Sequence, residues 1–144
     1  MNPRLPLFCL CLCLMLGAPC AGAELVLVAN PNSGITHLSR DEVVNIYLGR
    51  YRRLAGGQTA EPIDLQGDAE SKAQFYRKLV NKSLAEINAY WARLMFSGKT
   101  LPPRQVATSE EALLQVATRQ EALAYVERSR ADRRVAIVFD LDER

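Results

Sequence analysis

The sequence predicts an α/β protein with a single, mainly parallel sheet flanked by helices. Short segments of strand-type residues alternate along the chain with segments whose apolar residues recur at helical spacing. Three of the helical segments start with a capping motif. The length of 144 residues, with 49% hydrophobic and 24% charged residues, is ordinary for one globular domain. No internal repeat or linker divides the chain.

The first expected strand is the run 25–29, which is apolar at every position. Such a run is typical of a strand that is buried on both faces. Five turn-forming residues, 30–34, end it. A helix then begins after Ser39, because Ser39 and Glu42 form a capping box, and Gly49 is a natural stop.

The middle of the chain predicts one strand and two helices. The polar segment 50–61 reads as a loop and the alternating segment 62–66 as a short strand. Apolar residues at helical spacing predict a helix around Phe75, and a capping box at Ser83 opens the next helix. One apolar stripe of that helix comprises Leu84, Ile87, Trp91 and Leu94. We therefore expect Trp91 in the core rather than on a ligand.

The last third predicts a further helix and a final strand. Thr108 and Glu111 give a third capping box, which opens a helix through Val116. The segment 121–127 fits a helix or a strand. The segment 134–139, in which Val135, Ile137 and Phe139 alternate with other residues, predicts a strand.

The first 23 residues have the order of a secretory signal peptide. A short start with Arg4 precedes the apolar run 7–16, and the small residues 21–23 follow. The alternatives are a permanent membrane anchor, for which the run is too short, and lipid attachment at Cys20. Cleavage after Ala23 would give a periplasmic mature chain of residues 24–144, which does not span the membrane.

The composition of that mature chain argues against catalysis. All four cysteines lie in the first 20 residues, so residues 24–144 offer no disulfide, thiolate or iron–sulfur ligand. The one histidine, His37, has no obvious partner in sequence, and neither a phosphate-binding Gly-Lys loop nor a Gly-x-Ser-x-Gly elbow is present. We expect no enzyme, no metal and no cofactor.

Two basic clusters stand out, at 50–53 and 128–134. Each is either a solvated surface or an anion-facing patch. The formal net charge of +2 is too small to indicate a nucleic-acid partner.

Several short motifs follow one another in a characteristic order. They are Val28-Ala29-Asn30-Pro31, residues 38–43, Ile46-Tyr47-Leu48-Gly49-Arg50, Ala89-Tyr90-Trp91, Phe96-Ser97-Gly98, Pro102-Pro103 and residues 121–126. In these motifs the chain resembles the periplasmic phosphate-binding proteins of bacterial ABC transporters, and most closely their short, single-domain relatives. The resemblance implies that residues 24–144 form one periplasmic-binding-protein-like lobe.

The resemblance also implies a candidate oxyanion site. Members of the family bind oxyanions with a Ser-Gly-Thr-Arg turn ahead of a Phe at the start of a helix. Counting back from Phe75 places Lys72 at the arginine and Ser71 at the threonine, whereas Glu70 and Ala69 replace the glycine and the serine. Asn30 and Ser33, in the turn after the first strand, complete the candidate ligand-binding set of Asn30, Ser33, Ser71 and Lys72.

Two functions follow from these observations. The first is an exported solute-binding-like protein that binds phosphate or another oxyanion weakly and is linked to phosphate uptake. The second is a periplasmic interaction or regulatory module without small-molecule binding, whose partner is a membrane transporter or sensor protein. They differ in whether the turn 30–33 and the helix start 69–72 converge on one pocket.

Overall fold

The computed structural model describes residues 22–143 of the chain. Five strands form one sheet in the order β3-β2-β4-β1-β5. Their bounds are β1 Leu25–Ala29, β2 Glu61–Leu65, β3 Arg104–Val106, β4 Ala122–Glu127 and β5 Ala136–Asp140. β2 is parallel to β3 and β4, and β1 is antiparallel to β4 and β5. Four strands therefore run in one direction and β1 runs against them, which confirms an α/β fold with a mainly parallel sheet.

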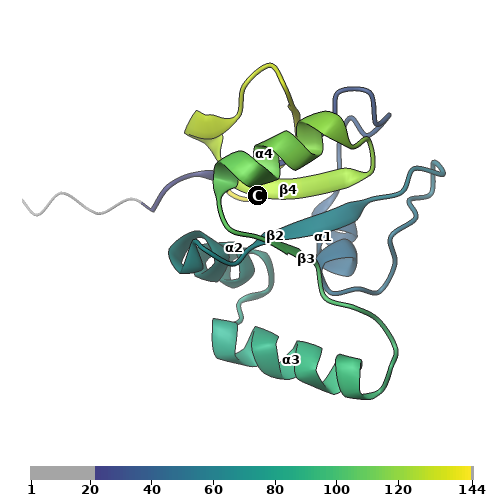
Figure 1. Ribbon diagram of the computed structural model, residues 1–144, viewed down its shortest axis with the longest axis vertical. Coiled ribbons are helices and arrows are strands. Elements are labelled where there is room, and N and C mark those ends of the chain that lie inside the picture. The colour runs from purple at the N-terminus through teal and green to yellow at the C-terminus, as the bar shows by residue number, and fades with distance from the viewer. Residues whose placement is uncertain (1–21, 144) are drawn as a thin grey trace, which may run out of the picture.

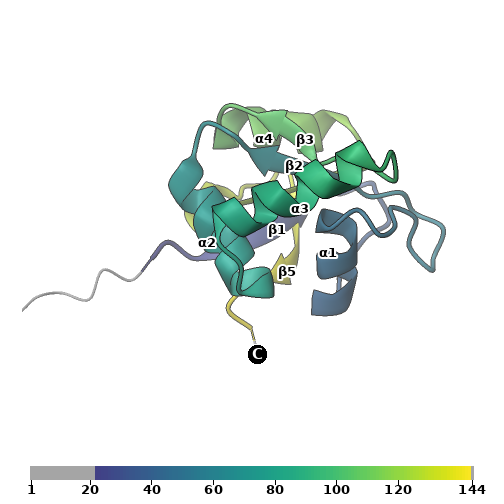
Figure 2. The ribbon, with the colours of Figure 1, turned by 90° about the horizontal axis from the view of Figure 1, so that it is seen from below.

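Helices cover both faces of this sheet. Their bounds are α1 Arg40–Tyr47, α2 Ala69–Val80, α3 Leu84–Phe96 and α4 Ser109–Thr118, and a short 3-10 helix spans Arg128–Arg130. α4 lies on one face, and α1 and α2 lie on the other (Figure 1). α3 packs on α2 and is farther from the sheet, as the view from below shows (Figure 2).

The sequence motifs account for where the helices begin. Ser39 and Ser83 both form full capping boxes in the structure, with Glu42 and Glu86. Thr108 accepts a hydrogen bond from the Glu111 N–H, but the Glu111 carboxylate accepts from Ala107 instead of from the cap residue. The third motif therefore caps the helix without forming the expected reciprocal pair.

The structure settles two strands that the sequence patterns left undetermined. The segment 121–127, which fitted a helix or a strand, contains strand β4, and the short strand β3 lies at residues 104–106, where no element was expected. In β5 the expected alternation fails, because Ile137 is exposed while Val138 and Phe139 are both buried. The register between β1 and β5 shifts at this point, so one strand carries an extra residue.

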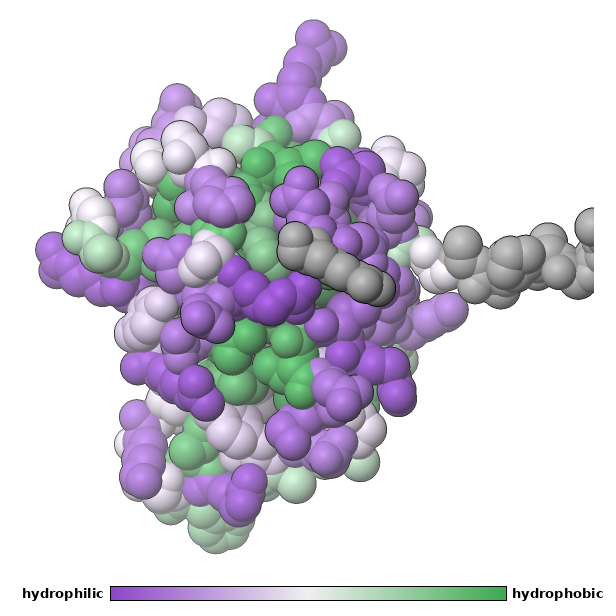
Figure 3. Space-filling model, turned by 180° about the vertical axis from the view of Figure 1, so that it is seen from behind, coloured by the Kyte–Doolittle hydropathy of each residue, from purple (hydrophilic) through white to green (hydrophobic). Residues whose placement is uncertain are grey.

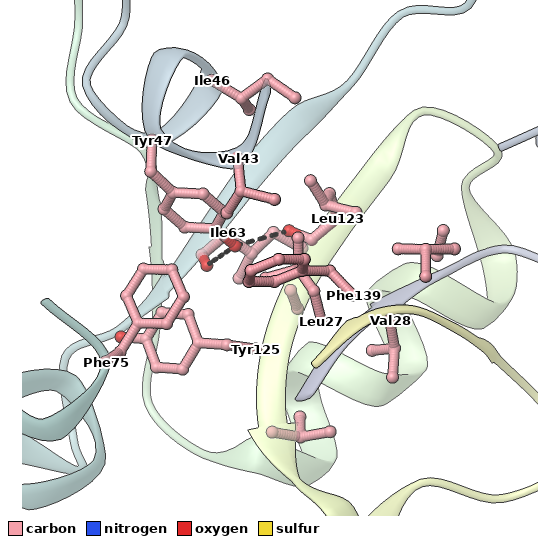
Figure 4. Close-up of a cluster of buried hydrophobic side chains, with 14 of the residues drawn as sticks. Leu27, Val28, Val43, Ile46, Tyr47, Ile63, Phe75, Leu123, Tyr125 and Phe139 are labelled. Carbon is pink, nitrogen blue, oxygen red and sulfur yellow. Dashed lines mark hydrogen bonds between the residues drawn. The ribbon is translucent and has the colours of Figure 1, made fainter. Parts of the chain in front are cut away.

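The core is built on the two central strands. β1 is buried along its whole length, as expected, and β4 is buried except at its last residue. On the face below the sheet, Tyr47 of α1 and Phe75 of α2 pack with Tyr125 of β4 (Figure 4). Trp91 is 7% exposed, which confirms its place in the core.

Hydrophilic side chains dominate the face seen in Figure 3, with hydrophobic residues visible in patches between them. No helix within residues 22–143 is long and apolar enough to cross a membrane. The expected signal peptide lies outside the described residues, apart from its last two positions, Gly22 and Ala23.

Candidate functional site

The start of α2 is the first candidate site, and a carboxylate of the chain itself lies there. Asp68 is the N-cap of α2, and its Oδ1 accepts a hydrogen bond of 3.0 Å from the Ser71 N–H. The Ser71 side chain and N–H, in that order, lower the pKa of Asp68, so the group stays ionised. Backbone N–H groups at a helix start are the groups that would hold a bound anion. At the start of α2, the Ser71 N–H already donates to the Asp68 carboxylate.

Lys72, the expected cation, is directed to a buried partner. Its Nζ lies 3.2 Å from Oδ2 of Asp64, and the Asp64 side chain is 2% exposed. The Tyr76 hydroxyl donates to the same oxygen at 3.0 Å, and the Tyr125 hydroxyl donates to Oδ1. Asp64 thus has one cation and two hydroxyl donors around it, which is what a buried carboxylate needs.

The same network fixes the protonation of the tyrosines. Burial, reinforced by the negative charge of Asp64, raises the pKa of Tyr76 and of Tyr125 well above the ordinary value. Burial and Asp64 likewise raise the pKa of Tyr47, whose hydroxyl donates to the Ile63 carbonyl (Figure 4). All three hydroxyls are therefore neutral donors: those of Tyr47 and Tyr76 join α1 and α2 to β2, and that of Tyr125 joins β4 to β2.

Asn30 and Ser33 have local structural partners. The Asn30 side-chain amide donates to the carbonyls of Val116 and Ala117, both at 3.0 Å. Its Oδ1 accepts from the Asn32 N–H at 2.8 Å, and Ser33 Oγ accepts from the Ile35 N–H at 3.1 Å. Asn30 is buried and caps the carbonyl end of α4.

The strand register keeps these residues apart from Ser71 and Lys72. Ala29 pairs with Leu123, and Glu61 pairs with Ala122, so the turn after β1 lies beside the start of β2. α2 begins beyond the other end of β2. Figure 1 shows the turn at the upper right and α2 at the left. The structure brings Ser71 and Lys72 together, but not with Asn30 and Ser33.

A hollow that the sequence did not indicate lies between the starts of α2 and α4. Its volume is about 310 Å³, and its lining includes Gly67, Asp68, Thr108, Ser109, Glu110 and Arg130. The two helix starts meet because β2 and β3 are parallel and each ends here. Gly67 permits this approach, since a Cβ there would lie 2.0 Å from the Ala107 carbonyl oxygen. The capping motif at Thr108 predicted the helix start, but no pattern predicted that Arg130 would face it.

Glu110 and Arg130 of this hollow each have an ion-pair partner that does not line it. Glu110 pairs with Arg134 at 2.7 Å, and that arginine chiefly lowers the pKa of Glu110. Arg130 lies 3.8 Å from Glu127 in an exposed pair. His37 is exposed and lies elsewhere. Within residues 22–143 no group of three or more His, Cys, Asp and Glu side chains is arranged to hold a metal ion.

Comparison with solved structures identifies the fold. The chain is similar to an ABC-type phosphate transport receptor from Vibrio cholerae, with a TM-score of 0.62, 14% identity and coverage of 81% of this chain and 45% of that one. It is similar to a phosphate ABC transporter substrate-binding protein with bound phosphate from Clostridium perfringens, with a TM-score of 0.63, 13% identity and coverage of 81% and 44%. For PstS from Borrelia burgdorferi the TM-score is 0.61, the identity 13% and the coverage 81% and 47%.

These likenesses establish that the chain has the fold of one lobe of such receptors. The chain spans less than half the length of each of the three structures. No family model and no curated protein matches the sequence.

Proposed function

We propose that the protein is a periplasmic interaction or regulatory module, built on a single solute-binding-like lobe and without small-molecule binding. The observation that supports this most is the pairing of Lys72 with buried Asp64, beside the Ser71 N–H that donates to Asp68. The groups that the family resemblance assigns to an oxyanion are already used by carboxylates of the chain.

The length of the chain supports the same proposal. A two-lobed binding protein encloses its ligand by closing one lobe on the other. A single lobe offers an open surface, which buries less of a small ligand than a closed cleft does. An open surface suits a protein partner, and we propose a membrane transporter or sensor protein that meets the mature chain after export and cleavage behind Ala23. The proposal includes no enzymatic step.

A second candidate function is weak binding of phosphate or another oxyanion, linked to phosphate uptake. The hollow between the starts of α2 and α4 favours it, because two helix N-termini and Arg130 face the same space. Asp68 and Glu110 lie in the same hollow and oppose a dianion. We therefore expect an affinity no tighter than about 0.1 mM, or about −5.5 kcal/mol.

Calorimetry with inorganic phosphate separates the two candidates. It compares the exported protein with an Ala69→Ser/Glu70→Gly variant, which rebuilds the family turn. Absence of binding by both forms supports the interaction module. Millimolar binding that the variant strengthens supports the second candidate, and Arg130→Ala should then weaken it. Arg133→Ala is the matched control, since Arg133 is exposed and does not line the hollow. Micromolar binding by the unmodified protein would contradict both.

A further inference from the structure

Basic and acidic residues are unevenly distributed along this chain, although its net charge is small. Residues 43–60 and 87–109 together contain six basic residues and no acidic one. The six are Arg50, Arg52, Arg53, Arg93, Lys99 and Arg104. All 16 acidic residues lie in other parts of the sequence.

The fold brings the loop after α1 and the loop after α3 to one end of the molecule. The Arg52 guanidinium donates to the Leu101 carbonyl at 3.2 Å, and the Tyr90 hydroxyl donates to the Leu48 carbonyl at 2.6 Å. Figures 1 and 2 both show the loop after α1 and the loop after α3 at the same end as the last turn of α3. The six positive charges therefore add to one local field.

None of the six forms an ion pair within residues 22–143. A hollow of about 370 Å³ lies at this end, and Arg52, Arg104 and Leu101 line it. Glu61 and Arg119 also line it, and Arg119 pairs with both Glu61 and Glu121, at 2.8 and 2.7 Å. An anionic group that enters this hollow meets Arg52 and Arg104.

Large apolar side chains project from the same end. Phe96 is 97% exposed, Leu101 71% and Met95 54%. Tyr51, within the Arg50–Arg53 loop, is also exposed. A single exposed apolar residue is normal. Here three exposed apolar residues lie within seven consecutive positions, at the end of α3 and in the loop after it. We call Met95, Phe96 and Leu101 the apolar tip.

We propose that this basic end, with its apolar tip, binds peripherally to the surface of an anionic phospholipid bilayer. Protruding apolar side chains can enter the boundary between headgroups and acyl chains, and surrounding Arg and Lys are attracted to anionic headgroups. Tyr51 has the amphipathic character that favours this interface. The proposal does not depend on the proposed function, because the oxyanion candidate site lies at the opposite end of β2.

Vesicle co-sedimentation of the exported protein tests the proposal. Vesicles of equal parts phosphatidylglycerol and phosphatidylcholine are compared with pure phosphatidylcholine at low salt. We expect binding to the anionic vesicles at least tenfold stronger than to the neutral ones, and a steep decrease as salt is added. Absence of binding to anionic vesicles at low salt, or equal binding to both kinds, would overturn the proposal.

Paired charge reversals locate the surface. Arg53→Glu/Lys99→Glu should reduce anionic-vesicle binding about tenfold or more, because both residues are exposed at the basic end. Lys82→Glu/Arg133→Glu is the matched control, because it changes the net charge by the same amount at two residues away from the basic end. An equal loss of vesicle binding in the two double variants would show that binding depends on net charge alone. It would overturn the assignment of the binding surface to the basic end.

The apolar tip has its own test. Met95→Ser/Phe96→Ser removes two exposed side chains, so the fold should be retained while binding to anionic vesicles falls about tenfold. Thermal unfolding of the same variant reports whether the fold is kept. Binding that needs the charges but not the tip, together with equal binding to polyglutamate, would reassign the surface to an acidic protein and overturn the lipid proposal.

Discussion

Lys72 Nζ lies 3.2 Å from Oδ2 of Asp64, a side chain that is only 2% exposed. Both Tyr76 and Tyr125 donate to the same carboxylate. The cation that the family resemblance assigns to an oxyanion thus balances a buried charge and ties α2 to β2. Substitutions of Lys72 and Asp64 should therefore change the stability of the fold.

Replacing Lys72 with Met should destabilise the protein by about 3–5 kcal/mol, because it leaves Asp64 buried without a cation. The double variant Lys72→Met/Asp64→Asn removes the unpaired charge and should recover at least half of the loss. Denaturant unfolding, followed by fluorescence of the single tryptophan, measures both. A loss below about 1 kcal/mol in Lys72→Met would show that solvent already screens this pair.

Alkaline pH should unfold the protein as its buried tyrosines ionise. Burial first, and the charge of Asp64 second, raise the pKa of Tyr47, Tyr76 and Tyr125. An unfolded tyrosine loses its proton near pH 10, whereas these three keep theirs while folded. Their contribution to stability is therefore full below about pH 10 and falls as the pH rises above it.

Phenolate absorbance and circular dichroism, recorded together, test this coupling. The absorbance of the three buried tyrosines should appear together with the loss of secondary structure. Full ionisation of all tyrosines while the native circular dichroism persists would contradict the buried network.

Trp91→Ala should cost about 3–5 kcal/mol, the range for truncation of a large buried aromatic side chain. Trp91 packs edge to face with Tyr90 at 5.2 Å, and a Cβ added at Gly49 would lie 2.7 Å from its ring. Its Nε1 is buried without a hydrogen-bond partner. Trp91→Phe should therefore cost clearly less than Trp91→Ala, because it removes that unpaired donor and keeps most of the ring. Circular dichroism during denaturant unfolding gives both values, and equal losses would show that ring packing matters little.

Sequence patterns predicted the helices because their determinants are local. The capping residues Ser39 and Ser83 lie within three positions of the groups they bind. Strand β3 was missed because it has three residues, of which Arg104 and Gln105 are exposed, so no pattern is visible. The role of Asp64 could not be predicted from local patterns, because its partner Tyr125 lies 61 residues away in the sequence.

Export should yield a protein whose first residue is Glu24, because an apolar run followed by small residues predicts cleavage behind Ala23. Mass spectrometry of the periplasmic fraction measures the N-terminus. Recovery of a membrane-bound chain that begins at Met1 would indicate an anchor. A lipid on Cys20 would indicate the alternative processing route.

Asn30 tests whether the turn after β1 is structural. Its amide donates to two carbonyls at the end of α4, and the side chain is 6% exposed. Asn30→Ala leaves those carbonyls unpaired and should cost about 1–3 kcal/mol. Asn30→Asp keeps the shape but sets a carboxylate against two carbonyl oxygens at a helix C-terminus, so near neutral pH it should cost more than Asn30→Ala.

The pH dependence of Asn30→Asp provides the decisive measurement. Burial and the facing carbonyls should raise the pKa of the introduced carboxyl above its unfolded value. The unfolded state then releases its proton first, so the variant should lose stability as the pH rises through the unfolded pKa of about 3.9 and further toward neutrality. Toward acid pH the protonated carboxyl can donate to one carbonyl. The difference in unfolding free energy between Asn30→Asp and the unmodified protein should then become smaller. Urea unfolding at several pH values measures this difference, with Asn30→Ala as the control that lacks a titrating group. A difference that stays constant with pH would show that the side chain at this position does not face the end of α4.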